Sequence, residues 1–281
     1  MPPTAPAPAT LRVNGVRIAH EQTGTAGPPV VLVHGSWGSH ASWDPVVPRL
    51  ARRHRVITYD RRGHGDSERP PGQGHFAEDV ADLAGIVERL GPAPAWVAGN
   101  SAGAVIALKL AAARPDLLRG VIAHEPPLSS LLDDDMRASM GDADDGPLAE
   151  VRRLLARGDF AAGAQLFVDE VALGPGSWQR LPDAMRRTMV RNAPTYLDEL
   201  ADPSWREIDQ PGLARFAGPV LLTSGGHSPP FYTSILDRLA ELLTAVRRHV
   251  FRDAGHIPYA THPDDWARTF LSFVGPRGAA T

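Results

Sequence analysis

The five residues Gly99-Asn100-Ser101-Ala102-Gly103 form a Gly-x-Ser-x-Gly pattern, which is the clearest chemical signal in the chain. They directly follow an apolar run that ends at Ala98 and precede an alanine-rich segment typical of a helix. A sharp turn from a strand into a helix exposes the serine hydroxyl above a sheet and needs small residues on either side. Free N–H groups and the helix dipole at such a turn stabilise negative charge. We therefore expect Ser101 to act as a nucleophile.

A base that could activate this serine is expected near the C-terminus. The segment Asp253-Ala254-Gly255-His256-Ile257 follows the last predicted strand. A histidine on such a loop can reach over the sheet, and an ordinary imidazole titrates close to neutral pH. The chain has 11 histidines, so the position behind a glycine after the last strand is what singles out His256 as the general base.

A second loop, His34-Gly35-Ser36-Trp37-Gly38, follows an earlier predicted strand. A glycine-containing loop at this place can point a backbone N–H at the same spot as the N–H of Ala102, which together make the two donors of an oxyanion hole. Ser36 is our first choice for the second donor and Gly35 is the alternative. Trp37 is either a core aromatic or a wall of the substrate pocket.

These residues need a sheet whose strands end side by side. Runs rich in apolar residues, typical of strands buried on both faces, occur at residues 30–33, 55–59, 95–98, 118–123 and 220–223, and we expect another such strand at residues 247–251. Helical segments lie between them at residues 42–52, 75–90, 102–114, 230–243 and 263–274. This alternation favours a mostly parallel, doubly wound sheet with helices on both faces. Asn14-Gly15 between two short β-type runs predicts a hairpin at the start.

We expect one α/β domain with an inserted helical cap. Residues 11–125 and 211–281 form the core, and residues 1–10 form a flexible tail rich in proline, alanine and threonine. Residues 126–210 contain no buried apolar run of strand length, but their helical segments carry many apolar and aromatic side chains. The simplest place for such an insertion is over the carboxyl edge of the strands, where ligands bind in these folds. The alternative is a second helical domain with no role in binding.

Composition narrows the functional classes. The 281 residues are 43% hydrophobic and 22% charged, with a formal net charge of −3, so nothing indicates nucleic acid or an anionic membrane as a partner. No apolar run approaches the roughly 18 residues of a membrane-spanning helix, and the start lacks a signal peptide, so we expect a soluble cytoplasmic protein. The absence of cysteine excludes a thiolate nucleophile and a cysteine zinc site. The only lysine, Lys109, is expected on a solvated helix surface.

From residue 11 to residue 273 the chain resembles the α/β-hydrolase family. The His34-Gly35 loop, the segment Asp60-Arg61-Arg62-Gly63-His64-Gly65-Asp66-Ser67, the turn at Ser101 and the Gly255-His256 loop occur in the family's order. The resemblance implies hydrolysis through an acyl-enzyme, with no cofactor or metal and with a structural role for His64. Epoxide hydrolases and haloalkane dehalogenases are disfavoured, because they carry aspartate where this chain has Ser101.

Ser101 and His256 need an acid as the third member of a catalytic triad, and the position of this acid departs from the family's commonest pattern. Its acid usually follows the strand predicted at residues 220–223, but Ser228 stands where an aspartate is expected, and serine cannot stabilise an imidazolium. One strand earlier, Glu125 offers a carboxylate at a strand's carboxyl end. Asp253 is the only other carboxylate close to His256 in sequence, and we expect it to shape the loop. Glu125 is therefore the expected catalytic acid.

Two short motifs resemble the zearalenone lactonase group. That group also carries a His-Glu dipeptide after this strand, which matches His124-Glu125, and we expect His124 to be structural. Asn192-x-Pro194-x-Tyr196 resembles its cap pattern, in which an aromatic residue packs on the substrate. The candidate substrate-binding residues are Trp37, Met189, Tyr196 and Ile257.

We expect a serine esterase or lactonase that acts, as a monomer or homodimer, on an apolar small-molecule ester, aromatic or macrocyclic. Three alternatives stay open: a carbon–carbon bond hydrolase with the same triad, an acyltransferase or perhydrolase, and a non-catalytic ligand receptor. A carbon–carbon bond hydrolase needs polar groups to bind its acidic dienol substrate, and the apolar content of the predicted cap disfavours this alternative. A receptor would not need Ser101 and His256.

Overall fold

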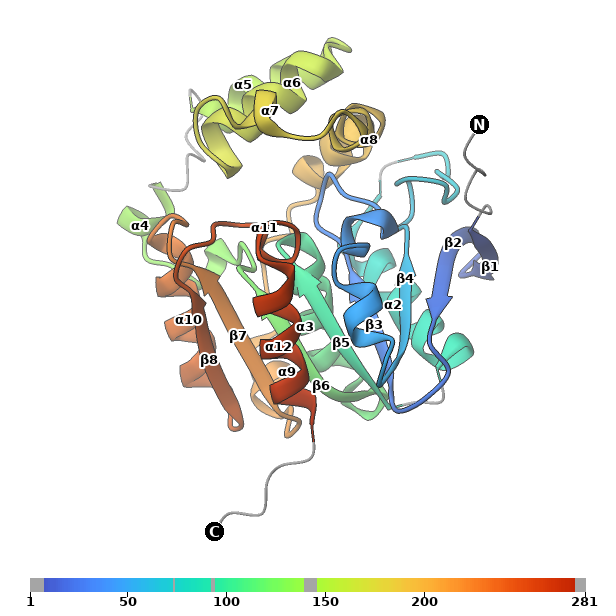
Figure 1. Cartoon of the computed structure of the whole chain (residues 1–281). Coiled ribbons are helices and arrows are strands. Elements are labelled where there is room, and N and C mark those ends of the chain that lie inside the picture. Colours follow the sequence, from blue (N-terminus) through green and yellow to red (C-terminus); the bar gives the residue numbers. More distant parts are fainter. Residues whose placement is uncertain (1–7, 73, 92–93, 139–145, 276–281) are drawn as a thin grey trace.

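The computed structural model describes residues 8–72, 74–91, 94–138 and 146–275. Within them, eight strands form a single sheet in the order β1-β2-β4-β3-β5-β6-β7-β8 (Figure 1). The strands are β1 (Ala9–Val13), β2 (Val16–Thr23), β3 (Pro29–Val33), β4 (Arg55–Tyr59), β5 (Ala95–Asn100), β6 (Leu118–His124), β7 (Val220–Gly225) and β8 (Val246–Phe251).

The sheet is antiparallel only at its beginning. Val13 pairs with Val16 around Asn14 and Gly15, whose φ angles of 46° and 82° have the positive sign that a type I′ hairpin turn needs. Strand β2 is antiparallel to β4, and the pairs from β4 through to β8 are parallel. This confirms the predicted fold class.

Helices cover both faces of the sheet (Figure 1). Alternate residues of β3 divide between the two faces: Val31 and Val33 pack in one buried cluster, and Val30 and Leu32 in the other. The first cluster takes its helical side chains from α2 (Phe76–Leu90), α3 (Ala102–Ala113), α9 (Gln210–Ala214) and α10 (Phe231–Leu242). The second takes them from η1 (His40–Trp43), α1 (Val47–Leu50), α11 (Pro258–Thr261) and α12 (Pro263–Val274).

Two local expectations were wrong. The continuous helix expected at residues 42–52 is divided into η1 and α1, because Pro45 and Pro48 have no N–H to donate to a preceding turn. Lys109 is half-buried rather than solvated, since its Nζ donates to the carbonyl oxygen of Ser204 at 2.7 Å. Lys109 therefore ties α3 to the chain that returns from the cap.

A separate layer of helices lies above the carboxyl edge of the strands (Figure 1). It comprises α5 (Pro147–Ala156), α6 (Phe160–Leu166), the π-helix η4 (Phe167–Ala172), α7 (Ser177–Arg180) and α8 (Asp183–Ala201). Its apolar residues form a cluster of their own, which includes Val151, Trp178 and Met189 and takes one residue, Trp37, from the core. We call this layer, α5 to α8, the cap.

The ends of the predicted segments differ from the structure. Leu128 and Leu131 at one end of residues 126–210, and Trp205 at the other, pack in the core cluster and not in the cap. At the N-terminus, strand β1 begins at Ala9, so the tail expected to run to residue 10 is too long by two residues. Residues 1–7 lie outside the described residues. In the described part of the chain, no helix has the length and apolar character needed to cross a membrane.

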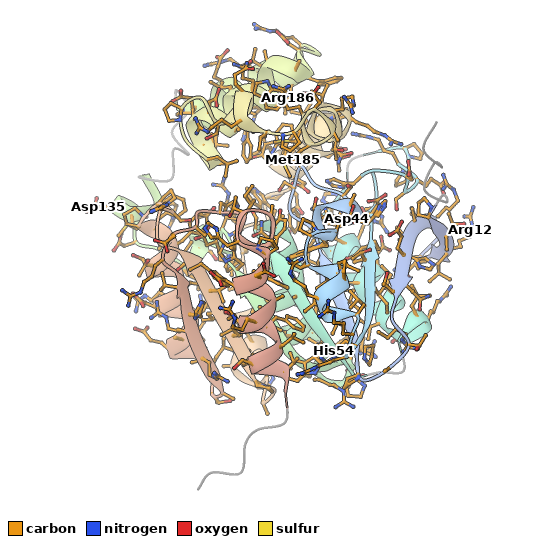
Figure 2. The ribbon with its side chains drawn as sticks, viewed as in Figure 1. Arg12, Asp44, His54, Asp135, Met185 and Arg186 are labelled. Carbon is orange, nitrogen blue, oxygen red and sulfur yellow. The ribbon has the colours of Figure 1, made fainter. Side chains whose placement is uncertain are left out.

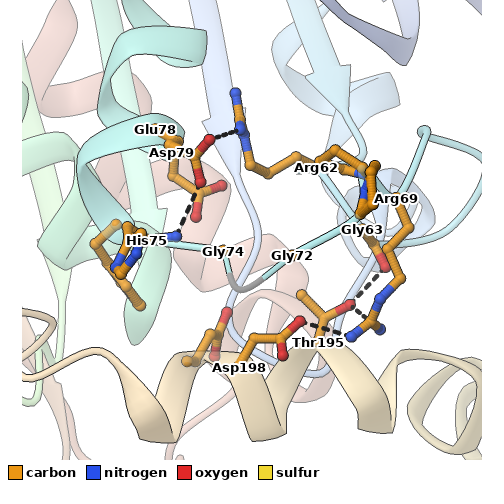
Figure 3. Close-up of a pocket in the computed structure, with 14 residues that line it drawn as sticks. Arg62, Gly63, Arg69, Gly72, Gly74, His75, Glu78, Asp79, Thr195 and Asp198 are labelled. Carbon is orange, nitrogen blue, oxygen red and sulfur yellow. Dashed lines mark hydrogen bonds and ion pairs between the residues drawn. The ribbon is translucent and has the colours of Figure 1, made fainter.

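Polar contacts attach α8 to the core, as Figure 3 shows. Thr195 Oγ1 donates to the carbonyl oxygen of Gly63 at 2.6 Å and accepts from Arg69 at 3.1 Å. Arg69 also donates to the Asp198 carboxylate at 2.6 Å. Deeper in the same interface, the buried Arg61 guanidinium lies 2.7 Å from the carboxylate of Glu199. Because these groups lie on one side of α8, the helix is fixed in a single orientation over the sheet.

Candidate active site

Ser101 lies between β5 and α3, at the turn that the Gly-x-Ser-x-Gly pattern predicts. Its backbone has φ 55° and ψ −121°, outside the regions that residues with a Cβ usually occupy. A Cβ on Gly99 would come within 2.2 Å of the Gly103 carbonyl oxygen, and one on Gly103 within 2.1 Å of the Val33 carbonyl oxygen. Both glycines are therefore required by close backbone contacts, and the turn holds Ser101 above the carboxyl edge of the sheet.

The structure brings Glu125 and His256 together. His256 Nδ1 lies 2.6 Å from Glu125 Oε2, and the N–H of Gly225 donates to the other carboxylate oxygen at 2.6 Å. Glu125 is completely buried, and its φ of 45° lies in the left-handed region, which residues with a Cβ seldom occupy. Burial has the largest single effect and raises the pKa of Glu125, but the opposing effects, chiefly those of His124 and His256, together exceed it and bring the pKa down to about 2. The carboxylate is therefore charged at neutral pH.

His124, Glu125 and His256 are also the group in the described residues that could hold a metal ion, with one ligand atom from each within 4.8 Å of the others. Both Glu125 oxygens already accept short hydrogen bonds. His124 Nδ1 lies 2.9 Å from Thr223 Oγ1, and burial lowers the pKa of His124 to about 4. The geometry therefore fits a carboxylate–imidazole pair supported by a neutral histidine.

Ser101 and His256 line the same pocket, although the described residues show no direct hydrogen bond between them. Such hydrogen bonds are often long before a substrate is bound. Because Nδ1 of His256 faces Glu125, Nε2 is the nitrogen left for Ser101.

Tyr232, which the sequence analysis missed, stacks on the imidazole of His256 with ring centres 5.3 Å apart and planes 20° apart. Asp253 is exposed, and no hydrogen bond or ion pair joins it to His256 among the described residues, where Glu125 is the carboxylate partner of His256.

The loop expected to complete an oxyanion hole lies against Ser101. A Cβ on Gly35 would be 3.3 Å from Ser101 Cβ, and both Gly35 and Ser36 line the pocket. Ala102 is the first residue of α3, so its N–H has no acceptor in the preceding turn. His64 Nε2 lies 2.8 Å from the carbonyl oxygen of Ser36, which gives His64 the structural position that the family resemblance implies.

The cap helps to hold this loop. Asn192 Nδ2 donates to the carbonyl oxygen of Gly38 at 2.7 Å, and its Oδ1 accepts the N–H of Gly65 at 3.1 Å. Asn192 is almost completely buried. One side chain of α8 thus joins the candidate oxyanion loop to the loop that carries His64.

A cavity of about 310 Å³ opens between the cap and the core, large enough for a small organic molecule. In Figure 2, Met185 lies on the part of the cap that faces the core and Asp44 lies on the core below it. Three of the four residues expected to bind substrate, Trp37, Met189 and Ile257, line this cavity. Other lining residues that the sequence analysis did not single out are Asp44, Phe167, Leu173, Leu181, Met185, Thr188 and Tyr259.

Tyr196 was wrongly assigned to the substrate pocket. It is 2% exposed, does not line the cavity and packs in the cap cluster. Its ring centre lies 4.5 Å from that of Trp37 and 5.1 Å from that of Phe167, both of which do line the cavity. Since Tyr196 stands behind these two walls, it supports the pocket without reaching it.

We expect Tyr196→Ala to lower the free energy of unfolding by about 3 to 5 kcal/mol, because it removes a buried ring from the cap cluster. Activity should fall by a similar factor on a large aromatic ester and on a short acetyl ester. Thermal unfolding together with kcat/KM for both esters measures this, and Tyr196→Phe, which keeps the ring, is the control. A loss confined to KM for the large ester would return Tyr196 to the substrate-binding residues.

Comparison with known proteins agrees with this architecture. A family model described as the alpha/beta hydrolase fold matches residues 28–263. The chain is 39% identical over 125 residues to the uncharacterized hydrolase YraK of Bacillus subtilis, a match that covers 44% of this chain and 46% of YraK. It therefore spans less than half the length of this curated relative.

Two solved structures are similar over most of the chain. An alpha/beta hydrolase from Sphaerobacter thermophilus superposes with a TM-score of 0.79 at 30% identity and covers 95% of this chain and 100% of its own. An enol-lactonase from Burkholderia xenovorans superposes with a TM-score of 0.76 at 22% identity, with 95% and 99% covered, which is a likeness of fold. From its sheet order, its strained serine turn and the family match, the chain belongs to the α/β-hydrolase fold family.

Proposed function

We propose that the protein is a serine hydrolase that cleaves a carboxylic ester or lactone of an apolar small molecule through an acyl-enzyme. One observation carries the proposal: the buried, charged carboxylate of Glu125 lies 2.6 Å from His256 Nδ1, and His256 lines the same pocket as the strained Ser101. A carboxylate, an imidazole and a serine at a strand-to-helix turn are the groups that acyl transfer needs.

In the first half of the reaction, Ser101 Oγ attacks the carbonyl carbon while its proton passes to Nε2 of His256. Glu125 stabilises the imidazolium that forms and keeps the Nδ1–H tautomer in place. The N–H groups of Ala102 and Ser36 donate to the oxyanion. When the carbon–oxygen bond to the alcohol breaks, the proton on Nε2 goes to the leaving oxygen, which in a lactone stays attached through the opened ring.

In the second half, a water molecule gives a proton to Nε2 and its oxygen attacks the acyl carbon. Collapse of the second oxyanion breaks the bond to Ser101 Oγ, which recovers its proton from His256. The products are a carboxylic acid and an alcohol, or a single hydroxy acid from a lactone. Every proton in this scheme moves through one nitrogen of His256, so no cofactor is required.

The lining of the cavity supports an ester over the acidic dienol of a carbon–carbon bond hydrolase. Arginine and lysine are missing from the described lining, although the chain has 29 basic residues, so no cation is available there for a carboxylate of the substrate. The enol-lactonase named above shares the fold. Glu125 after β6 also resembles the zearalenone lactonase pattern, which supports lactones as one substrate class.

Labelling with a fluorophosphonate, followed by peptide mass spectrometry, tests the proposal. We expect the added mass on the peptide that contains Ser101, and loss of ester hydrolysis in proportion to labelling. Aryl esters of graded chain length and macrocyclic lactones then rank the substrates. A protein that binds these compounds but is neither labelled nor active would be a receptor, and turnover of a dienoate without turnover of esters would indicate a carbon–carbon bond hydrolase.

A further inference from the structure

Among the described residues, Asp44 is the one acidic residue that lines the cavity, in a lining that is otherwise largely apolar. Asp44 follows η1 and is exposed, as are three other lining residues, Ala41, Pro182 and Ala184. Residues that face both solvent and the cavity must lie where the cavity opens. Asp44 therefore lies at the mouth of the pocket, on the core side, opposite the start of α8.

The Asp44 carboxylate has no structural task among the described residues. None of them donates a hydrogen bond to it or lies within ion-pair distance, and it does not cap α1. Its nearest charged neighbours, Glu21 and His40, have opposite effects on it: burial and Glu21 raise the pKa of Asp44, and His40 lowers it. Exposed and without an ion-pair partner among the described residues, Asp44 is available to a ligand.

His40 does not neutralise this end of the pocket. Its Nδ1 lies 2.8 Å from the buried Asp60 and its Nε2 lies 3.7 Å from Glu21. The imidazole of His40 thus already interacts with two carboxylates other than that of Asp44. Even when it is protonated, His40 offers one positive charge to the three carboxylates of Glu21, Asp44 and Asp60.

In the described part of the chain, no arginine of the cap lines the cavity or lies within ion-pair distance of Asp44. Arg186, beside the lining residue Met185, pairs with Asp183 and lies over the ring of Trp178. Figure 2 places Arg186 farther from the core than Met185. Within the described lining the cavity therefore has a negative end at its mouth and apolar walls leading to Ser101.

We propose that Asp44 is a specificity-determining residue, and that the preferred substrates are esters that carry an organic cation at one end of an apolar skeleton. The inference rests on the proposed hydrolase function and narrows its substrate class. A cationic group of the substrate at the mouth would be attracted by the Asp44 carboxylate, while the rest of the substrate fills the apolar cavity. Anionic substrates would be repelled by the same group.

The test compares esters that differ only in charge. Trimethylammonium and tert-butyl groups have nearly the same shape, so each is placed at the end of acyl chains of graded length on a common nitrophenyl ester, and in a second series on the alcohol. A primary ammonium series separates hydrogen bonding from charge alone. At the best length we expect the wild type to favour the cation in kcat/KM by about tenfold, and added salt should reduce this ratio.

Asp44→Asn should bring the ratio of cationic to tert-butyl ester close to one. The matched control is Asp135→Asn, which removes the same charge from the exposed start of α4 (Asp134–Ala138) and should keep the wild-type ratio (Figure 2). A wild-type ratio near one, or a ratio that survives Asp44→Asn, overturns the inference.

Binding separates this inference from the proposed function. The same pairs of compounds are titrated calorimetrically against Ser101→Ala, so that affinity is read without turnover. If the cation binds about tenfold more tightly in an Asp44-dependent way but no ester is hydrolysed, the hydrolase proposal fails and the cation site stands. If tert-butyl esters are hydrolysed through Ser101 and bind as tightly as the cations, the cation site fails alone.

Discussion

Ser101→Ala should lower kcat for a good ester substrate by about 10⁴ to 10⁶ while leaving the fold and substrate binding almost unchanged. The substitution keeps the Cβ that the turn already accommodates and removes only the hydroxyl, so the backbone at Gly99 and Gly103 has no reason to move. What remains is binding and the oxyanion hole, which cannot form an acyl-enzyme. Steady-state kinetics, thermal unfolding and equilibrium binding of the unreacted ester measure the three quantities.

Ser36→Ala is the matched control for this variant. It makes the same chemical change in the same pocket, but the proposed role of Ser36 uses only its backbone N–H, so kcat should stay within a few-fold of the wild type. If Ser101→Ala keeps more than about a tenth of the activity, the acyl-enzyme mechanism is wrong. If Ser36→Ala is instead as damaging as Ser101→Ala, the Ser36 hydroxyl takes part directly.

The local patterns in the sequence were sufficient for the sheet and for the turn at Ser101. The inner parallel strands are rich in apolar residues, and the helix after Ser101 is marked by alanines and by glycines that close contacts require. Both signals lie within a few neighbouring residues. To place these parts in one fold, the sequence analysis needed in addition only the alternation of strands and helices along the chain and the order of the family's motifs. The edge strand β8 was wrongly expected to be buried on both faces, because residues 247–250 are exposed.

The pocket was harder to predict, because its walls come from contacts between distant segments. Tyr196 has the composition of a ligand-binding residue, but α8 turns it toward Trp37 and into the cap cluster. Phe167 lies in a π-helix, whose hydrogen bonds span one residue more than those of an α-helix, so that the helix face shifts in a way that no 3.6-residue pattern describes. Asp44 gives no signal in sequence, since its proposed role depends on its place among the residues that line the cavity.

Glu125→Gln should lower kcat by about 10² to 10⁴ with little change in KM for a neutral ester. The amide has the same size and its oxygen can still accept the N–H of Gly225, so the NH₂ group would face Nδ1 of His256. That nitrogen must then accept a hydrogen bond, which moves the imidazole proton to Nε2, where it blocks proton transfer from Ser101. The amide also leaves the imidazolium of the transition state without a balancing charge.

Two controls test whether Glu125 acts through its charge on His256. Asp253→Asn removes the same charge from the exposed loop just before His256 and should be nearly silent, as should Ser228→Ala at the family's usual acid position. Because the Glu125 pKa is about 2, its carboxylate stays ionised from about pH 4 upward, so wild-type activity should not fall with Glu125 protonation in that range. A large loss in Asp253→Asn together with a small one in Glu125→Gln would move the acid to Asp253, and the short contact between His256 and Glu125 would then be structural only.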